Sequence, residues 1–244
     1  METTNISKRE SQVINEIEER DMIFFSPRDV CRFLGIEKRN AYNLLSRMKE
    51  KDLVKSIESG RYILREHLNS KDVYELASNI VDTSYLGFMS ALHFHDMIDQ
   101  VPRTIQIAST KRKKPLEIQG TKIKFVKIRE KDFFGYEDYD GTVASDPEKT
   151  VIDSLRLPGK AGDVSKIAEL DFKQLDQRKL IRYSERTESS ATASRLGYIM
   201  EKKNIGFDTE RVQNLIRHYS RLDPTNEQKD PISKWKLYAN RETS

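Results

Sequence analysis

The sequence predicts an α+β protein, in which a small helical unit with a β-hairpin precedes a mixed α/β domain with a helical C-terminal part. Three observations predict this class. Two short helical patterns flank Gly35, and two strand-like runs follow them around a Ser59-Gly60 turn. Lysines alternate with apolar residues over 122–126, as in a half-exposed strand. From residue 147 onwards, apolar residues recur at helical spacing.

Residues 1–66 begin with two helices that carry clear start signals. Ser7 and Glu10 have the spacing of a capping box for a helix over residues 7–20. The second helix has a capping serine, a proline in its first turn, a capping-box acid and a terminal glycine: Ser26, Pro27, Asp29 and Gly35.

The third helix has one apolar and one polar face. Its apolar residues have the spacing of a single buried face: Ala41, Leu44, Leu45 and Met48. The polar face carries side chains that can reach base edges or phosphates: Arg39, Asn40, Tyr42, Asn43, Ser46 and Arg47. A hairpin pattern follows, with Arg61 beside its tip. These features predict a winged helix-turn-helix that places the polar face in the major groove and Arg61 near the DNA backbone. A winged helix that binds protein instead of DNA stays open.

The remaining sequence divides into a linker and a second domain. Residues 67–82 are expected to be a linker with a short helix, and residues 83–244 the mixed α/β domain. In that domain we expect a buried helix over 84–95, strands at 104–108 and 122–128, a helix that starts at Asp146-Pro147, further helices near 161–170, 172–184, 188–203 and 209–221, and a final strand near Trp235 and Leu237. Gly197 predicts close packing against a neighbour.

Charge is unevenly distributed along the chain. Residues 103–131 contain ten Lys or Arg and two Glu, whereas residues 132–176 contain eleven acids and five bases. The basic and acidic blocks indicate a polarised surface. Within the first block, a basic loop can supply phosphate contacts or can be a solvated hairpin tip: Lys111, Arg112, Lys113 and Lys114.

Composition excludes several classes of protein. The chain has 244 residues, a formal net charge of +4 and one cysteine, which excludes an internal disulfide framework and four-thiolate metal sites. The longest apolar runs are too short to span a membrane, and residues 1–20 are too polar for a signal peptide. We therefore expect a cytoplasmic protein that does not contact a membrane.

Signatures of catalysis are absent from the sequence, which has no glycine-rich phosphate loop and no nucleophile elbow. We therefore expect no enzyme activity, no metal and no cofactor. His93 and His95 are two residues apart, so on one helix they cannot share a metal ion. A metal-dependent nuclease stays open as an alternative, because five carboxylates could converge on one ion: Asp96, Asp99, Asp146, Glu148 and Asp153.

Four segments of the second domain resemble AbiEi-type antitoxins. Residues 84–102 resemble a helix and turn of that family, and residues 141–153 contain DPEKT followed by an aspartate three residues later. Residues 195–201 read RLGYIME, and Lys234-Trp235 with Asn240 is similar to the family's C-terminal ending. The segments occur in the family's order behind a winged helix, so the resemblance covers nearly the whole chain.

The resemblance implies an antitoxin of a type IV toxin–antitoxin system, with residues 83–244 as an antitoxin-like domain. The partner would be a nucleotidyltransferase-like toxin, neutralised without a stable complex. The N-terminal domain would repress its own operon by binding inverted repeats in double-stranded promoter DNA. A stand-alone winged-helix transcriptional regulator without a toxin partner stays open.

Overall fold

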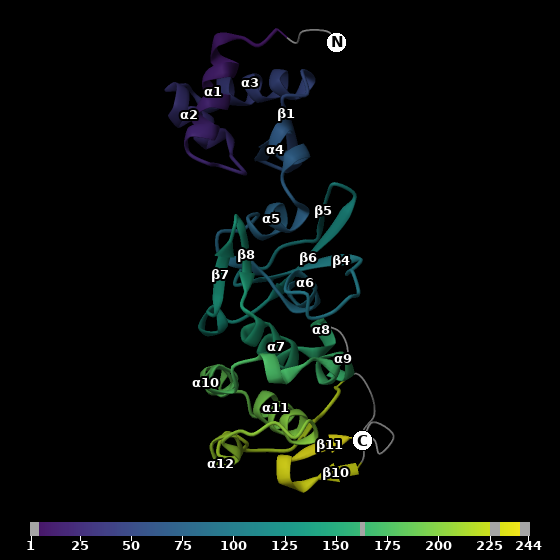
Figure 1. Cartoon of the computed structure of the whole chain (residues 1–244). Coiled ribbons are helices and arrows are strands. Elements are labelled where there is room, and N and C mark those ends of the chain that lie inside the picture. The colour runs from purple at the N-terminus through teal and green to yellow at the C-terminus, as the bar shows by residue number, and fades with distance from the viewer. Residues whose placement is uncertain (1–4, 162–163, 225–229, 240–244) are drawn as a thin grey trace.

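The computed structural model describes residues 5–161, 164–224 and 230–239 and has a mixed α/β architecture (Figure 1). Three regions follow one another along an elongated molecule: N-terminal helices, a central sheet, and a C-terminal helical region that ends in short strands. This mixture of helices and strands confirms the α+β class.

The N-terminal region has three helices, α1 (Lys8–Glu19), α2 (Pro27–Leu34) and α3 (Lys38–Glu50). Both expected capping boxes form. The Ser7 N–H donates to the Glu10 carboxylate at 2.7 Å, and the Ser26 N–H and hydroxyl both donate to Asp29 at 2.7 Å. Gly35 ends α2 in the left-handed conformation, at φ 61°. The expected inner faces are buried in one core: Val13, Ile17, Val30, Ala41, Leu44, Leu45 and Met48.

An antiparallel hairpin follows α3 and consists of β1 (Val54–Glu58) and β2 (Arg61–Leu64). Its turn lies at Ser59-Gly60, where Gly60 has φ 73°. Val54 and Leu64 belong to the core of the N-terminal helices, whereas Ile63 is buried in the core of the central sheet. The hairpin therefore connects the two cores.

The central sheet has six strands in the order β5-β6-β4-β3-β8-β7. Their bounds are β3 (Ser84–Leu86), β4 (Thr104–Ser109), β5 (Leu116–Ile118), β6 (Thr121–Lys127), β7 (Tyr136–Tyr139) and β8 (Thr142–Ser145). Strand β4 runs parallel to β6, and β3 runs parallel to β8. In β6, Lys122 and Lys124 are exposed while Ile123 is buried, as the alternating pattern predicts.

The prediction of one helix over residues 84–95 was wrong at its start. Residues Ser84–Leu86 form β3, and only Phe88–Phe94 form a helix, α6. Strand β3 lies between β4 and β8, where Tyr85 and Leu86 are fully buried. A strand buried on both faces and a buried helix have the same continuous apolar pattern, so periodicity alone cannot separate them.

Residues 67–82, where we expected a linker with a short helix, are packed against the central sheet. They contain most of α4 (Arg65–Ser70) and all of α5 (Val73–Ser78), which includes the expected short helix. Leu68, Leu76 and Ile80 are buried together with Ile105 and Ile123 of the sheet. The segment therefore covers one face of the central sheet and is part of its core.

The C-terminal region begins with α7 (Pro147–Arg156), capped by Asp146, whose carboxylate accepts a hydrogen bond from the Lys149 N–H at 2.8 Å. Val151, Ile152 and Leu155 are buried, as expected. Later helices are α8 (Pro158–Ala161), α9 (Val164–Glu169), α10 (Gln177–Thr187), α11 (Ser190–Lys202) and α12 (Thr209–Gln213). Short 3₁₀ turns lie at Phe172–Gln174 and Ser233–Trp235, and another, at Glu130–Asp132, precedes β7.

Two of these helices differ from their predicted bounds. Helix α10 starts at Gln177 instead of residue 172, because the Asp176 carboxylate caps it by accepting from the N–H groups of Arg178 and Lys179. Helix α12 ends at Gln213, and the chain continues into a small sheet of order β10-β11-β9. Its strands are β9 (Ser220–Arg221), β10 (Asp230–Ile232) and β11 (Leu237–Ala239).

Candidate nucleic-acid interface

Helix α3 presents an exposed polar face, as predicted. Ala41, Leu45 and Met48 have no exposed surface, which places the polar side chains on the opposite side of the helix. Tyr42 is 43% exposed, and the Lys38 ammonium lies 5.9 Å from the centre of its ring. The remaining residues predicted to bind DNA from this helix are all exposed: Arg39, Asn40, Asn43 and Arg47.

Polar partners are missing from this face. Within residues 5–161, 164–224 and 230–239, no side-chain hydrogen bond or ion pair involves Arg39, Asn40, Asn43 or Arg47. The N-cap residue Glu37 also makes no side-chain capping bond. The first N–H groups of α3 and the cationic side chains of Lys38 and Arg39 therefore lie together at the positive end of the helix dipole. Phosphates bind well at such a helix end.

Arg61 is half-buried, and its guanidinium contacts other groups of the chain, which the sequence did not predict. Its guanidinium donates to the Ile80 carbonyl and lies 3.3 Å from the Glu58 carboxylate. It also lies over the ring of Phe24, at 5.9 Å from the ring centre. The tip of the hairpin is thus attached to the central region through Arg61.

The basic loop divides into one internal and three exposed cations. The Lys113 ammonium pairs with Glu58, and its side chain is only 15% exposed. Lys111, Arg112 and Lys114 are exposed and, among the described residues, have no side-chain polar partner. The sequence predicted the same role for all four cations. In the fold, only Lys111, Arg112 and Lys114 are available to phosphates.

The strands of the basic and acidic blocks lie toward opposite edges of the central sheet. Residues 103–131 form β4, β5 and β6 at one side of the sheet. The opposite edge strand, β7, carries exposed Glu137 and Asp138. Phosphates would therefore be attracted to the side with the basic loop and repelled by the β7 edge.

Three of the five carboxylates of the nuclease alternative, Asp146, Glu148 and Asp153, have other partners. Asp146 accepts from the Tyr183 hydroxyl at 2.8 Å, and Lys179 lies 3.2 Å from Asp146 and 3.0 Å from Glu148. Partial burial by itself lowers the pKa of Lys179, but its hydrogen bond to Glu148 and the nearby carboxylates raise the pKa overall. Asp153 is buried and paired with Lys149. No group of three or more metal-ligating side chains occurs among the described residues.

The two histidines also have separate partners. The His93 ring nitrogen Nδ1 lies 3.0 Å from the Tyr74 hydroxyl, and His95 Nε2 lies 2.7 Å from the Ser145 carbonyl oxygen. Each ring therefore contacts a different neighbour.

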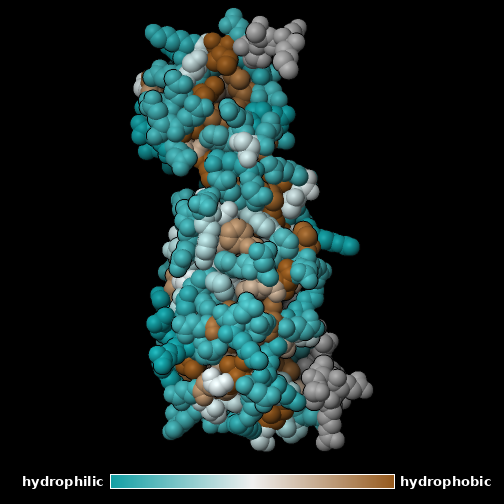
Figure 2. All heavy atoms as spheres, in the orientation of Figure 1, coloured by the Kyte–Doolittle hydropathy of each residue, from teal (hydrophilic) through white to brown (hydrophobic). Residues whose placement is uncertain are grey.

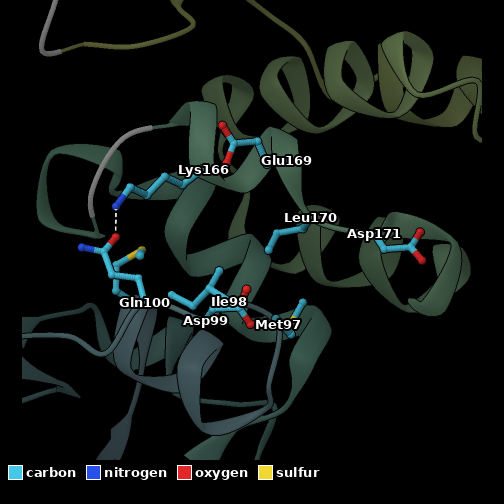
Figure 3. Close-up of a pocket in the computed structure, with 9 residues that line it drawn as sticks. Met97, Ile98, Asp99, Gln100, Lys166, Glu169, Leu170 and Asp171 are labelled. Carbon is cyan, nitrogen blue, oxygen red and sulfur yellow. Dashed lines mark hydrogen bonds between the residues drawn. The ribbon is translucent and has the colours of Figure 1, made fainter.

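Figure 3 shows a pocket of about 380 Å³ between the segment after α6 and helix α9. Its apolar surface comes from Met89, Met97, Ile98 and Leu170, and its polar side chains are Asp99, Gln100, Lys166, Glu169 and Asp171. Lys166 donates to the Gln100 side chain. Because its lining has three carboxylates and a single cation, this pocket does not favour phosphate and does not extend the interface.

No protein-family model matches the chain, and no curated protein sequence matches it. Among solved structures, the RV2827C protein from Mycobacterium tuberculosis has a similar fold, with 14% sequence identity and a TM-score of 0.59. The match covers 96% of this chain and 92% of that chain. At this identity the likeness concerns the fold alone.

Two of the segments that resemble antitoxins contact each other. Gly197 and Trp235, from two of these segments, lie in direct contact, while Asn240 lies outside the described residues. Gly197 and Trp235 therefore have structural roles in the core.

None of the described helices combines the length and the apolar character that crossing a bilayer requires.

Proposed function

We propose that the chain is a DNA-binding transcriptional repressor whose N-terminal region acts as a winged helix-turn-helix. The observation that carries this proposal is the polar face of α3, where four DNA-compatible side chains have no polar partner among the described residues. A face that serves only solubility does not need Arg and Asn side chains grouped near a helix N-terminus. Such a group suits base edges and phosphates in the major groove.

The polar residues of α3 have different tasks in this proposal. Arg39 and Asn43 lie one turn apart on the helix, and they read base edges. Asn40, Tyr42 and Arg47 flank them and contact the adjacent backbone. The exposed loop cations Lys111, Arg112 and Lys114 neutralise phosphates without reading sequence. We leave Arg61 and Lys113 out of the DNA surface, because their cationic groups are bound within the protein.

The test is binding of the full chain to duplex DNA from its own promoter, which is expected to contain inverted repeats. Replacing Arg39 or Asn43 by Ala should each cost about 1–3 kcal/mol, or about 5- to 150-fold in affinity. Arg9→Ala, an exposed substitution on α1, is the matched control and should bind as the wild type does. Equal binding by the Arg39→Ala/Asn43→Ala variant and the wild type would remove α3 as the reading helix.

We further propose that the protein is the antitoxin of a type IV toxin–antitoxin system. Support comes from the four segments that resemble AbiEi-type antitoxins and from their order along the chain. The functional partner would be a nucleotidyltransferase-like toxin encoded beside this gene, neutralised without a stable complex. A stand-alone regulator is the competing proposal, and it predicts no such neighbour.

Co-expression with the neighbouring gene product tests the antitoxin proposal. Growth should be rescued by the wild type and equally by Arg39→Ala/Asn43→Ala, because antitoxicity is assigned to the second domain. The full chain is preferable to a fragment, because Ile63 and Leu68 are buried in the core of the central sheet and truncation there would expose it. Rescue by neither protein, with DNA binding intact in the wild type, would favour the stand-alone regulator.

A further inference from the structure

A second exposed aromatic surface lies at the end of the molecule opposite α3, on the small sheet β10-β11-β9 (Figure 1). Tyr219 and Tyr238 are 43% and 38% exposed, and their ring centres lie 5.1 Å apart. We call the surface made by Arg217, His218, Tyr219, Arg221 and Tyr238 the tyrosine face.

Strand register and a ring contact place Tyr219, Arg221 and Tyr238 on one side of the small sheet. Tyr238 lies on the middle strand, directly opposite Arg221 of β9 and Pro231 of β10, and all three are exposed. Tyr219 directly precedes β9, and the 5.1 Å between its ring centre and that of Tyr238 places it on the same side. The rings and one guanidinium thus form a continuous outer surface.

The opposite side of this sheet anchors the tyrosine face. Leu237 and Ala239, the neighbours of Tyr238, are buried in the C-terminal core together with Trp235. The Trp235 indole N–H donates to the Glu201 carboxylate at 2.5 Å. A ring presented on such a support loses little conformational freedom when a ligand stacks on it.

Charge on the tyrosine face is positive. Arg217, His218 and Arg221 are exposed, and among the described residues their side chains have no hydrogen-bond or ion-pair partner. Glu188 lies near Arg217, but its carboxylate is already paired with Lys131. A ligand that covers this surface therefore gains most if it is anionic.

We propose that the tyrosine face binds a single-stranded nucleic acid. Unpaired bases stack on the rings of Tyr219 and Tyr238, while Arg217 and Arg221 neutralise the phosphates between them. Duplex DNA could use the cations, but its bases are already stacked and would leave the rings unused. A protein partner could cover the rings, yet it would need acidic groups to balance both arginines. This binding is separate from the duplex binding proposed for α3.

The experiment measures fluorescence anisotropy of the full chain with labelled oligouridine and oligothymidine of about 12 nucleotides, a length suited to such sites. Tyr219→Ala and Tyr238→Ala should each weaken binding about 5- to 150-fold. The conservative changes to Phe should keep most of the affinity, because stacking does not need the hydroxyl. A stronger complex with oligouridine than with oligothymidine would assign RNA as the ligand, and the reverse would assign DNA.

Several controls keep the proposal falsifiable. Arg217→Gln/Arg221→Gln changes only exposed side chains. It should lower the slope of log K against log salt by about 0.7 for each phosphate contact that is lost. Val101→Ala, at the most exposed large apolar residue, should have no effect. Arg39→Ala/Asn43→Ala should lose duplex binding but keep single-strand binding, so the two proposals can fail separately.

Three results would overturn this inference. One is unchanged single-strand affinity after both tyrosines are replaced by Ala. Another is loss of single-strand binding in Arg39→Ala/Asn43→Ala, which would move the ligand to α3. The last is a dimer in light scattering that Tyr238→Ala dissociates, which would make the tyrosine face a contact between two copies of the chain.

Discussion

The Glu58 carboxylate, at the tip of the β1–β2 hairpin, accepts a hydrogen bond from the Lys113 ammonium of the basic loop. Residues 55 positions apart in sequence are thereby joined. Arg61 adds a second link, because it contacts Glu58 and donates to the Ile80 carbonyl. The hairpin that would be the free wing of a DNA-binding domain is held against the central sheet.

This contact predicts a measurable coupling between the hairpin and the basic loop. Both side chains are partly exposed, at 35% and 15%, so the pair should contribute about 0.5–1 kcal/mol. A double-mutant cycle with Glu58→Gln and Lys113→Met, measured by urea unfolding, should give this coupling and show it shrinking in high salt. A coupling energy of zero at low salt would mean that the contact does not hold the hairpin.

The exposed loop cations predict the salt dependence of promoter binding. If Lys111, Arg112 and Lys114 each contact a phosphate, replacing all three by Gln should lower the slope of log K against log salt by about 2.7, at about 0.9 per contact. Lys113→Gln is the matched control from the same loop and should leave the slope unchanged, because its ammonium binds Glu58. A slope unaltered by the triple change would make the loop a solvated hairpin tip.

Gly197 predicts a strong size limit at the contact between α11 and Trp235. A Cβ atom at residue 197 would lie 2.1 Å from Cζ3 of the indole, so Gly197→Ala must displace a fully buried ring. We expect a loss of about 1–3 kcal/mol in the free energy of unfolding, measured with urea. Gly206→Ala is the control, because a Cβ there meets nothing within 4 Å. Equal stability of the two variants would contradict the packing.

A buried ion pair predicts an asymmetric response to mutation. Lys149 and Asp153 are paired and almost fully buried, and the Tyr85 hydroxyl donates to Asp153 at 2.6 Å. Asp153→Ala should cost about 3–5 kcal/mol, because it leaves a buried ammonium unpaired. Lys149→Met/Asp153→Asn removes both charges and keeps an acceptor for Tyr85, so thermal unfolding should show much of the loss recovered. A double variant less stable than Asp153→Ala would refute this reading.

Local signals in the sequence were sufficient for the three N-terminal helices. The capping boxes at Ser7 and Ser26, the left-handed Gly35 and the buried face around Leu44 depend on residues close in sequence, and each is present. The exposure of Arg39 follows from the same periodicity. These features could be predicted because helix formation and capping are short-range effects.

Long-range contacts account for what the sequence did not predict. Residues 84–86 form a strand only because β4 and β8 lie on both sides of them, and the segment containing Leu76 is a cover for the sheet only because that sheet exists. The orientations of Arg61 and Lys113 depend on partners far along the chain. Their charge and position in a hairpin and a loop gave no sign of these partners.

The Glu10 carboxylate predicts how the stability of the N-terminal region changes with pH. It is 1% exposed, and it accepts from the Ser7 N–H at 2.7 Å and from Lys51 at 2.8 Å. Burial by itself raises the pKa of Glu10, but these hydrogen bonds outweigh it and lower the pKa below its ordinary value of 4.5. The ionised form is thus favoured by folding.

Since the folded-state pKa of Glu10 lies below its unfolded value, its stabilising contribution is complete above about pH 4.5 and is lost as the pH falls through the folded-state pKa. Glu10→Gln should be less stable than the wild type by about 1 kcal/mol at pH 7, and the difference should shrink below pH 4.5. Urea unfolding of both proteins across this range measures it, with Glu19→Gln, an exposed residue of α1, as control. A difference that stays constant down to pH 3 would mean that Glu10 acts through its shape and not through its charge.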